Sequence, residues 1–192
     1  MTEIQCRQYM KNFFEQYYQK LAIGDGIALK RPLEEDDRAM WRDDADPQEE
    51  WKVWKLIPST ITNRDIEKLE ESMGVKLPNV MKAFLTVYHH YFESPVGENP
   101  ISDPCQAILC AWNPVLVKHG YLPFTWDEEG YYIRCMDLAN MPDEERCSIC
   151  QIDHEILFSW DEDDVQRTEI EQNMEFVAQN FFSYLESILD SK

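Results

Sequence analysis

The chain is short of the residues that build several common kinds of catalytic site. It has 6 glycines in 192 residues, and none of them lies in a phosphate-binding glycine loop or a nucleophile elbow. The zinc-protease pattern is also missing. With 10 prolines beside the 6 glycines, the composition is not that of a low-complexity chain. These absences leave the hypothesis of an enzyme without residues to carry the chemistry.

Long apolar runs are missing as well. No stretch has the roughly 20 apolar residues that a transmembrane helix needs. The first ten residues carry an acid at Glu3 and lack the apolar core of a secretory signal. We therefore expect a cytoplasmic protein that does not enter membranes. Its 6 cysteines are expected to be reduced thiols, because the cytosol disfavours structural disulfides.

Basic residues are scarce. Lys and Arg number 18 against 37 Asp and Glu, which gives a formal net charge of −19. Such a charge repels nucleic acid and anionic membrane surfaces and attracts cationic partners, so direct binding to DNA or RNA is not expected. An acidic surface also keeps proteins soluble. The charge by itself therefore names no partner.

Apolar residues are abundant enough for a folded core. Hydrophobic residues make up 44% of the chain and aromatic residues 12%, and the length suits one globular domain with appendages. We expect an N-terminal extension, residues 1–50, packed on a main domain, residues 51–192. The extension should begin with an amphipathic helix over residues 3–22. Its aromatic stripe is typical of core packing, and a docking surface for another chain is the alternative.

Two consecutive helices are predicted between Ile61 and Tyr91. Apolar residues recur at helical spacing before and after Gly74. Gly74 suits the left-handed conformation that ends a helix, and Pro78 suits the first turn of the next one. Asn63 is the predicted N-cap of the first helix.

The second half of the chain predicts strands and a closing helix. Residues 108–112 form a short apolar run suited to a buried strand or helix segment. Residues 131–138 and 147–153 have the composition of strands, and residues 156–160 are expected to form a neighbouring strand. Residues 165–189 keep the 3.6-residue period, which predicts one closing helix.

Three segments, in this order, resemble the SUKH superfamily, which holds bacterial toxin-immunity proteins and fungal cell-wall regulators. The first, residues 66–85, reads Ile-x-x-Leu-Glu-x-x-Met-Gly-Val-x-Leu-Pro-x-x-Met-x-x-Phe-Leu. The second is Leu-Pro-Phe at 122–124, followed by an acidic turn and the strand 131–137. The third, residues 176–185, is similar to the closing helix of the family. Residues 89–91, His-His-Tyr, depart from the Asn-Gly that is usual at the end of the second helix.

The resemblance implies an α+β domain with a twisted, mainly antiparallel sheet covered by helices. It implies no catalytic residues and no cofactor. It also implies protein binding, commonly as the intracellular antidote to a secreted toxin that is often a nuclease. The hypothesis is an immunity protein that occludes a cognate basic toxin. The alternatives are a regulatory scaffold that binds a cellular protein unrelated to toxins and, third, a zinc-dependent or other enzyme; the oligomeric state stays open.

Two acidic stretches are the candidate contact surfaces. A nuclease needs a basic cleft for the phosphate backbone, so acids that fill the cleft speed association and block the substrate. Trp41 is the candidate anchor, because tryptophan is enriched at binding hot spots. A solvated face has the same composition. The candidate partner-binding residues are Asp36, Asp37, Trp41, Asp43, Asp44, Asp161, Glu162, Asp163 and Asp164.

A metal site formed by Cys147, Cys150 and His154 is the remaining chemical hypothesis. Thiolates and imidazole are the ligand types that zinc prefers. The set lacks a fourth ligand, and alternation along a strand places the two cysteines on opposite faces. Buried thiols are therefore the preferred interpretation, and no metal is predicted.

Overall fold

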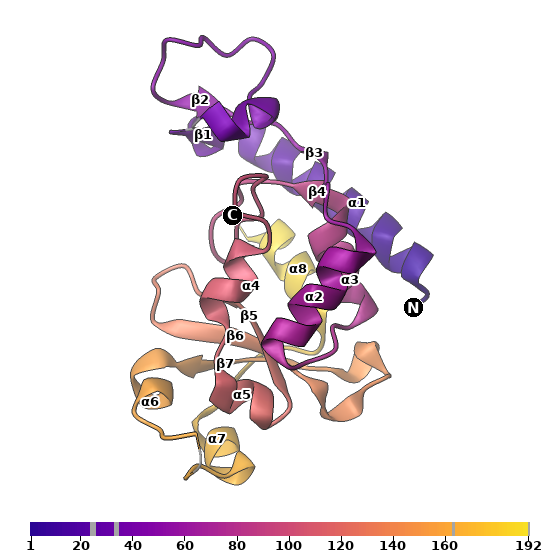
Figure 1. Ribbon diagram of the computed structural model, residues 1–192, viewed down its shortest axis with the longest axis vertical. Coiled ribbons are helices and arrows are strands. Elements are labelled where there is room, and N and C mark those ends of the chain that lie inside the picture. Colours follow the sequence, from indigo (N-terminus) through magenta and orange to yellow (C-terminus); the bar gives the residue numbers. More distant parts are fainter. Residues whose placement is uncertain (24–25, 33–34, 163, 192) are drawn as a thin grey trace.

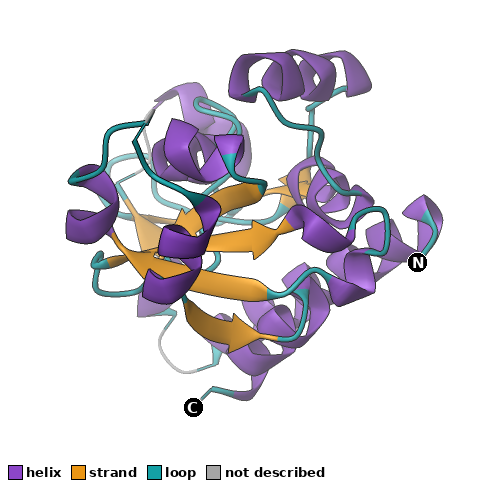
Figure 2. Cartoon of the chain, turned by 90° about the horizontal axis from the view of Figure 1, so that it is seen from below, coloured by secondary structure: helices purple, strands orange, loops and turns teal. Residues whose placement is uncertain are grey.

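A four-stranded antiparallel sheet with helices on both faces forms the centre of the molecule (Figure 2). The computed structural model describes residues 1–23, 26–32, 35–162 and 164–191. The predicted α+β class with an N-terminal helix is confirmed. Within the described residues, no helix is both long enough and apolar enough to cross a membrane.

The elements follow one another along the chain as Figure 1 labels them. The helices are α1 Glu3–Ala22, α2 Asn63–Met73, α3 Asn79–Val87, α4 Gln106–Ala111, α5 Pro114–Lys118, α6 His154–Phe158, α7 Arg167–Asn173 and α8 Phe181–Asp190. The strands are β1 Lys30–Arg31, β2 Lys52–Val53, β3 Ile57–Pro58, β4 Tyr88–His89, β5 Tyr121–Trp126, β6 Tyr132–Asp137, β7 Ile149–Asp153 and β8 Glu175–Ala178. Short 3-10 helices span Ile27–Leu29, Glu35–Met40, Leu138–Asn140 and Glu144–Arg146.

The central sheet has the order β5-β6-β7-β8, and each strand runs antiparallel to its neighbours. Two small sheets, β1 with β2 and β3 with β4, lie outside it. Successive side chains on a strand point to opposite faces, so the sheet divides the core in two. Leu122 and Phe124 belong to the larger part, together with α1, α2, α3 and α8. Tyr121 and Ile133 belong to the smaller part, under α5, α6 and α7.

Helix α1 is confirmed with the predicted bounds, and its aromatic stripe packs inside the chain. Thr2 and Gln5 form a capping box at its N-terminus. Phe13 and Phe14 are buried, and the Phe14 ring lies 5.3 Å from the ring of Phe84 on α3. The hydroxyl of Tyr9 donates to the Phe182 carbonyl at 3.1 Å. The extension therefore supplies part of the main core.

The helix pair is confirmed at its centre and corrected at both ends. Gly74 has a φ of 72° and ends α2 in the left-handed conformation, as predicted. The N-cap is Thr62 and not Asn63, because Thr62 and Asp65 form a reciprocal capping box. The second helix ends at Val87, since the next two residues pair as β4 with β3.

The C-terminal third departs most from the sequence prediction. Residues 156–160 are not a strand, because α6 begins at His154, where the Asp153 carboxylate accepts from the Glu155 amide at 2.7 Å. The predicted single closing helix is two helices, α7 and α8, separated by strand β8. Strand β8 pairs with the otherwise free edge of β7, and Asn180 then caps α8. Residues 108–111 of the apolar run lie in α4 and Trp112 is its C-cap, so the run is a helix segment, one of its two predicted forms.

Candidate partner-binding surface

The first acidic stretch is split between buried and exposed residues. The carboxylate of Asp37 is buried and accepts hydrogen bonds from the Ser102 amide at 3.0 Å and the Ser102 hydroxyl at 2.7 Å. Its neighbour Asp36 is exposed. Asp37 therefore ties the 3-10 helix at Glu35–Met40 to the loop before α4.

Replacing Asp37 with Ala is expected to lower the free energy of unfolding by about 1–3 kcal/mol, because it removes both hydrogen bonds that the buried carboxylate accepts from Ser102. The matched control is Asp36→Ala, one residue earlier on the exposed side, which should stay within about 0.5 kcal/mol of the wild type. Urea unfolding of the two variants measures the difference. Equal stability of the two variants would contradict an internal role for Asp37.

Trp41, Asp43 and Asp44 each contact a cationic side chain of the same chain. The Lys52 ammonium lies 4.4 Å from the centre of the Trp41 ring, which is half-buried. Arg42 holds Asp44 through two hydrogen bonds of 2.5 and 2.8 Å, and this contact lowers the pKa of the Asp44 carboxyl. Asp43 is exposed and pairs with a lysine, Lys55. The exposed acids that follow on this loop, Asp46, Glu49 and Glu50, lead to Trp51, whose side chain is 51% exposed.

The second acidic stretch borders a hollow lined by both polar and apolar side chains. Asp161, Glu162 and Asp164 are exposed, and Asp163 lies outside the described residues. Asp161 and Glu162 line a hollow of about 480 Å³ together with Phe158, a side chain that is 60% exposed. This stretch therefore offers carboxylates beside an accessible aromatic ring.

The two stretches lie at opposite ends of the molecule. Figure 1 has β1, β2 and the loop between them at one end, and α6 and α7 at the other. The predicted site residues are therefore not brought together into one compact patch.

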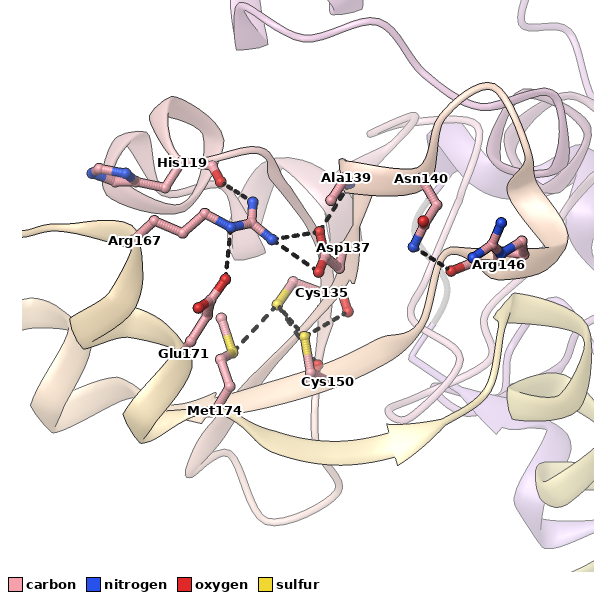
Figure 3. Close-up of polar contacts among 10 residues, drawn as sticks. All are labelled: His119, Cys135, Asp137, Ala139, Asn140, Arg146, Cys150, Arg167, Glu171 and Met174. Atoms are coloured by element: carbon pink, nitrogen blue, oxygen red, sulfur yellow. Dashed lines mark hydrogen bonds and ion pairs between the residues drawn. The ribbon is translucent and has the colours of Figure 1, made fainter.

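The sulfur and imidazole groups form no metal cluster. Cys150 lies opposite Cys135 across β6 and β7, and their sulfur atoms are 3.6 Å apart (Figure 3). Cys147 donates instead to the Asp143 carbonyl, and His154 Nδ1 lies 2.8 Å from the Tyr131 carbonyl. In the part of the chain that the structure describes, no three His, Cys, Asp or Glu side chains are placed to hold a metal ion.

The polar cluster around Arg167 joins α7 to the sheet. Its guanidinium donates to both carboxylate oxygens of Asp137 at 2.9 Å and to the carbonyl of His119 at 2.6 Å (Figure 3). It also lies 4.6 Å from the centre of the Tyr121 ring. Hydrogen bonds to Asp137 and Glu171 raise the pKa of Arg167 despite partial burial. Internal partners satisfy this cation, so the cluster has a structural role.

The sequence did not predict two adjoining hollows. One, of about 610 Å³, is lined by Tyr17, Trp51 and Tyr91 among others. The next, of about 510 Å³, lies beside α4 and the β5–β6 turn. The two hollows share Glu93 and Ser94 as lining residues. Their walls come from segments far apart in sequence, so no local motif signals them.

Three glutamates, Glu93, Glu98 and Glu128, line the second hollow. The Arg31 guanidinium forms salt bridges with two carboxylates, that of Glu93 at 2.7 Å and that of Glu98 at 3.6 Å. Burial raises the pKa of the Glu98 carboxyl although Arg31 opposes this change. Arg134 holds Glu128 at 2.8 Å. The hollow therefore carries more carboxylate than its own cations neutralise.

Fold and surface together define an α+β protein with hollowed, acidic and aromatic surface regions. A family model described as SMI1 / KNR4 family (SUKH-1) matches residues 60–187. The match spans more than half of the chain, so the chain belongs to this family. The wider SUKH group includes immunity proteins and regulators. A comparison with curated proteins finds no match for the chain.

Proposed function

We propose that the chain is a non-catalytic immunity protein that neutralises a cognate basic toxin, of the nuclease kind, by stoichiometric binding. The observation that carries the proposal is the family match over residues 60–187 in a chain whose net charge is −19. The family supports a protein-binding role, and the charge favours a cationic partner. The proposal places the protein in the cytoplasm, where such an antidote meets its toxin.

The physical mechanism is electrostatic steering followed by occlusion. A nuclease active site is basic because it must hold phosphate groups. Exposed carboxylates such as Asp36 and Asp161 would draw that site toward the chain and raise the association rate by roughly 10–10³-fold. Once seated, the protein occupies the volume that the nucleic acid needs, and no chemistry on the toxin is required.

Co-expression tests the proposal. The chain is produced in cells together with the protein encoded by the neighbouring gene, and growth and copurification are measured. Rescue of growth with a copurified complex supports immunity. No rescue and no complex with any adjacent gene product would contradict the proposal. Capture of a non-toxic cellular protein would favour a regulatory scaffold.

Salt is expected to weaken this association. Raising the ionic strength from about 0.05 M to about 0.5 M should slow association at least about tenfold, because screening removes the long-range attraction. The dissociation rate should change less, since close contacts are screened less. Stopped-flow fluorescence of the purified complex measures both rates. An association rate that does not depend on salt would contradict electrostatic steering.

A further inference from the structure

Three hollows follow one another along one side of the molecule. The first lies between α1 and β1, and it shares Glu93 and Ser94 with the second. The second includes Trp126, whose ring centre is 6.4 Å from that of Phe158. Phe158 lines the third hollow, with Asp161. The elements that line these hollows follow one another in Figure 1 from β1 past the loop before α4 and the β5–β6 turn to α6.

Carboxylates line the row of three hollows from Trp51 to Phe158, which we call the track. Glu93, Glu98 and Glu128 line its middle, and Asp161 and Glu162 line its lower end. The cations beside the middle and lower hollows are already engaged: Arg134 pairs with Glu128 at 2.8 Å, and the Lys118 ammonium donates to the Glu162 carbonyl at 3.0 Å. Lys30 and Arg31 line the upper hollow, and Arg31 is already divided between two glutamates. The surplus of carboxylate is complementary to cationic side chains.

Aromatic rings alternate with these carboxylates. Trp51 is 51% exposed at the upper end of the track, and Phe158 is 60% exposed near the lower end. Trp126 is half-buried between them and lies 5.6 Å from the His154 ring. A guanidinium group stacks on aromatic faces and pairs with carboxylates through two parallel hydrogen bonds. Arginine fits this alternation better than lysine, whose compact ammonium group is more strongly hydrated.

We propose that an extended, arginine-bearing segment of the partner protein docks along this face from Trp51 to Phe158. Arg31 and Arg134 each hold one carboxylate oxygen of Glu93 and Glu128, so the partner's guanidinium groups pair with the other oxygen of each and with exposed Asp161. The aliphatic stems and planar guanidinium groups of the arginines pack on the aromatic rings. Asp161 and Glu162 of the second acidic stretch thereby form one end of this face, and Trp51 forms the other. The inference rests on the proposed function in taking the partner to be a basic protein.

The first test uses a fluorescently labelled oligo-arginine peptide as the probe. Substituting Glu93→Gln together with Glu128→Gln is expected to weaken binding about tenfold. The matched control is Glu71→Gln with Glu186→Gln, which makes the same change in charge at exposed positions on α2 and α8. The control should weaken binding by less than about threefold. Equal weakening by the two double variants would overturn the docking face.

The second test concerns the aromatic anchors. Phe158→Ala should weaken binding of the same peptide at least about fivefold. Phe176→Ala on β8, where the native ring is 69% exposed, should leave binding unchanged. An oligo-lysine peptide should bind less tightly than oligo-arginine to the wild type. Loss of affinity in both phenylalanine variants alike would contradict the proposal.

Growth protection separates this inference from the proposed function. If the wild type neutralises a toxin and the Glu93→Gln, Glu128→Gln variant protects equally well, the docking face is wrong and the immunity function stands. If no toxin is neutralised while peptide binding still depends on these glutamates, the immunity function fails and the face stands as a site for basic segments.

Discussion

Deleting residues 1–59 is expected to leave the remaining chain unable to fold, although the family match begins at residue 60. In the part of this segment that the structure describes, seven side chains belong to the hydrophobic core. They are Cys6, Met10, Phe13, Phe14, Leu29, Met40 and Trp54. Truncating one large core side chain costs about 2–5 kcal/mol, and whole proteins are stable by about 5–15 kcal/mol. Loss of all seven side chains therefore costs more than the free energy of unfolding of a typical protein.

Circular dichroism and urea unfolding of the truncated chain measure this effect. The expected result is no near-ultraviolet signal and no cooperative transition. Within the full chain, Phe14→Ala should cost about 3–5 kcal/mol, while Ile4→Ala on the same helix, 80% exposed, should cost less than about 1 kcal/mol. A cooperatively folded fragment 60–192 would show that the extension is dispensable. The division into residues 1–50 and 51–192 stays a prediction until then.

Acid is expected to destabilise the protein through His90. The ring is fully buried between Phe14, at 4.7 Å, and Phe92, at 4.9 Å, and neither of its nitrogens has a hydrogen-bond partner. Burial, aided by His89, lowers the pKa of His90 from 6.5 to about 3. Below pH 6.5 the unfolded chain therefore binds a proton that the folded chain does not. Stability should fall by about 1.4 kcal/mol for each pH unit, or roughly 2–3 kcal/mol between pH 6.5 and 4.5.

His90→Leu is expected to remove a large part of this pH dependence. Burial also lowers the pKa of His89, which adds to the loss of stability in acid, and raises the pKa of Glu98, which opposes it. Burial raises the pKa of Glu70, but hydrogen bonds from Lys76, Lys82 and the Leu77 amide outweigh burial and lower it to about 2. The stabilisation from Glu70 is therefore lost only as the pH falls below 4.5. Urea unfolding at several pH values measures the slope, and parallel slopes for wild type and His90→Leu would refute the assignment.

The sequence predicted correctly those elements that are determined by residues close to one another in the chain. Helix α1 and the stop at Gly74 depend on helical period and on one glycine, and both are as expected. Strand β8 could not be separated from the closing helix, because Met174 and Val177 also satisfy the helical period. What decides β8 is the free edge of β7, which is a tertiary contact.

Long-range partners explain why the site residues were hard to assign. Asp37 and Asp36 look alike in a run of acids, yet Asp37 is bound by Ser102, 65 residues away. In the same way, the Glu144 carboxylate caps α3 by accepting from the backbone amides of Asn79 and Val80 at 2.7 and 3.0 Å. No pattern of residue spacing in the sequence predicts these long-range hydrogen bonds. The acidic composition predicted that negative surfaces exist, and the fold decides which acids remain exposed on them.

Titration of toxin activity by the purified chain tests the central claim most directly. The cognate toxin is held at a fixed concentration well above the dissociation constant, its nuclease activity is measured, and the chain is added stepwise. Stoichiometric occlusion predicts that activity falls linearly to zero at one equivalent of the chain, with the toxin intact afterwards. Full activity at excess chain, or inhibition that grows with time at substoichiometric amounts, would contradict the account.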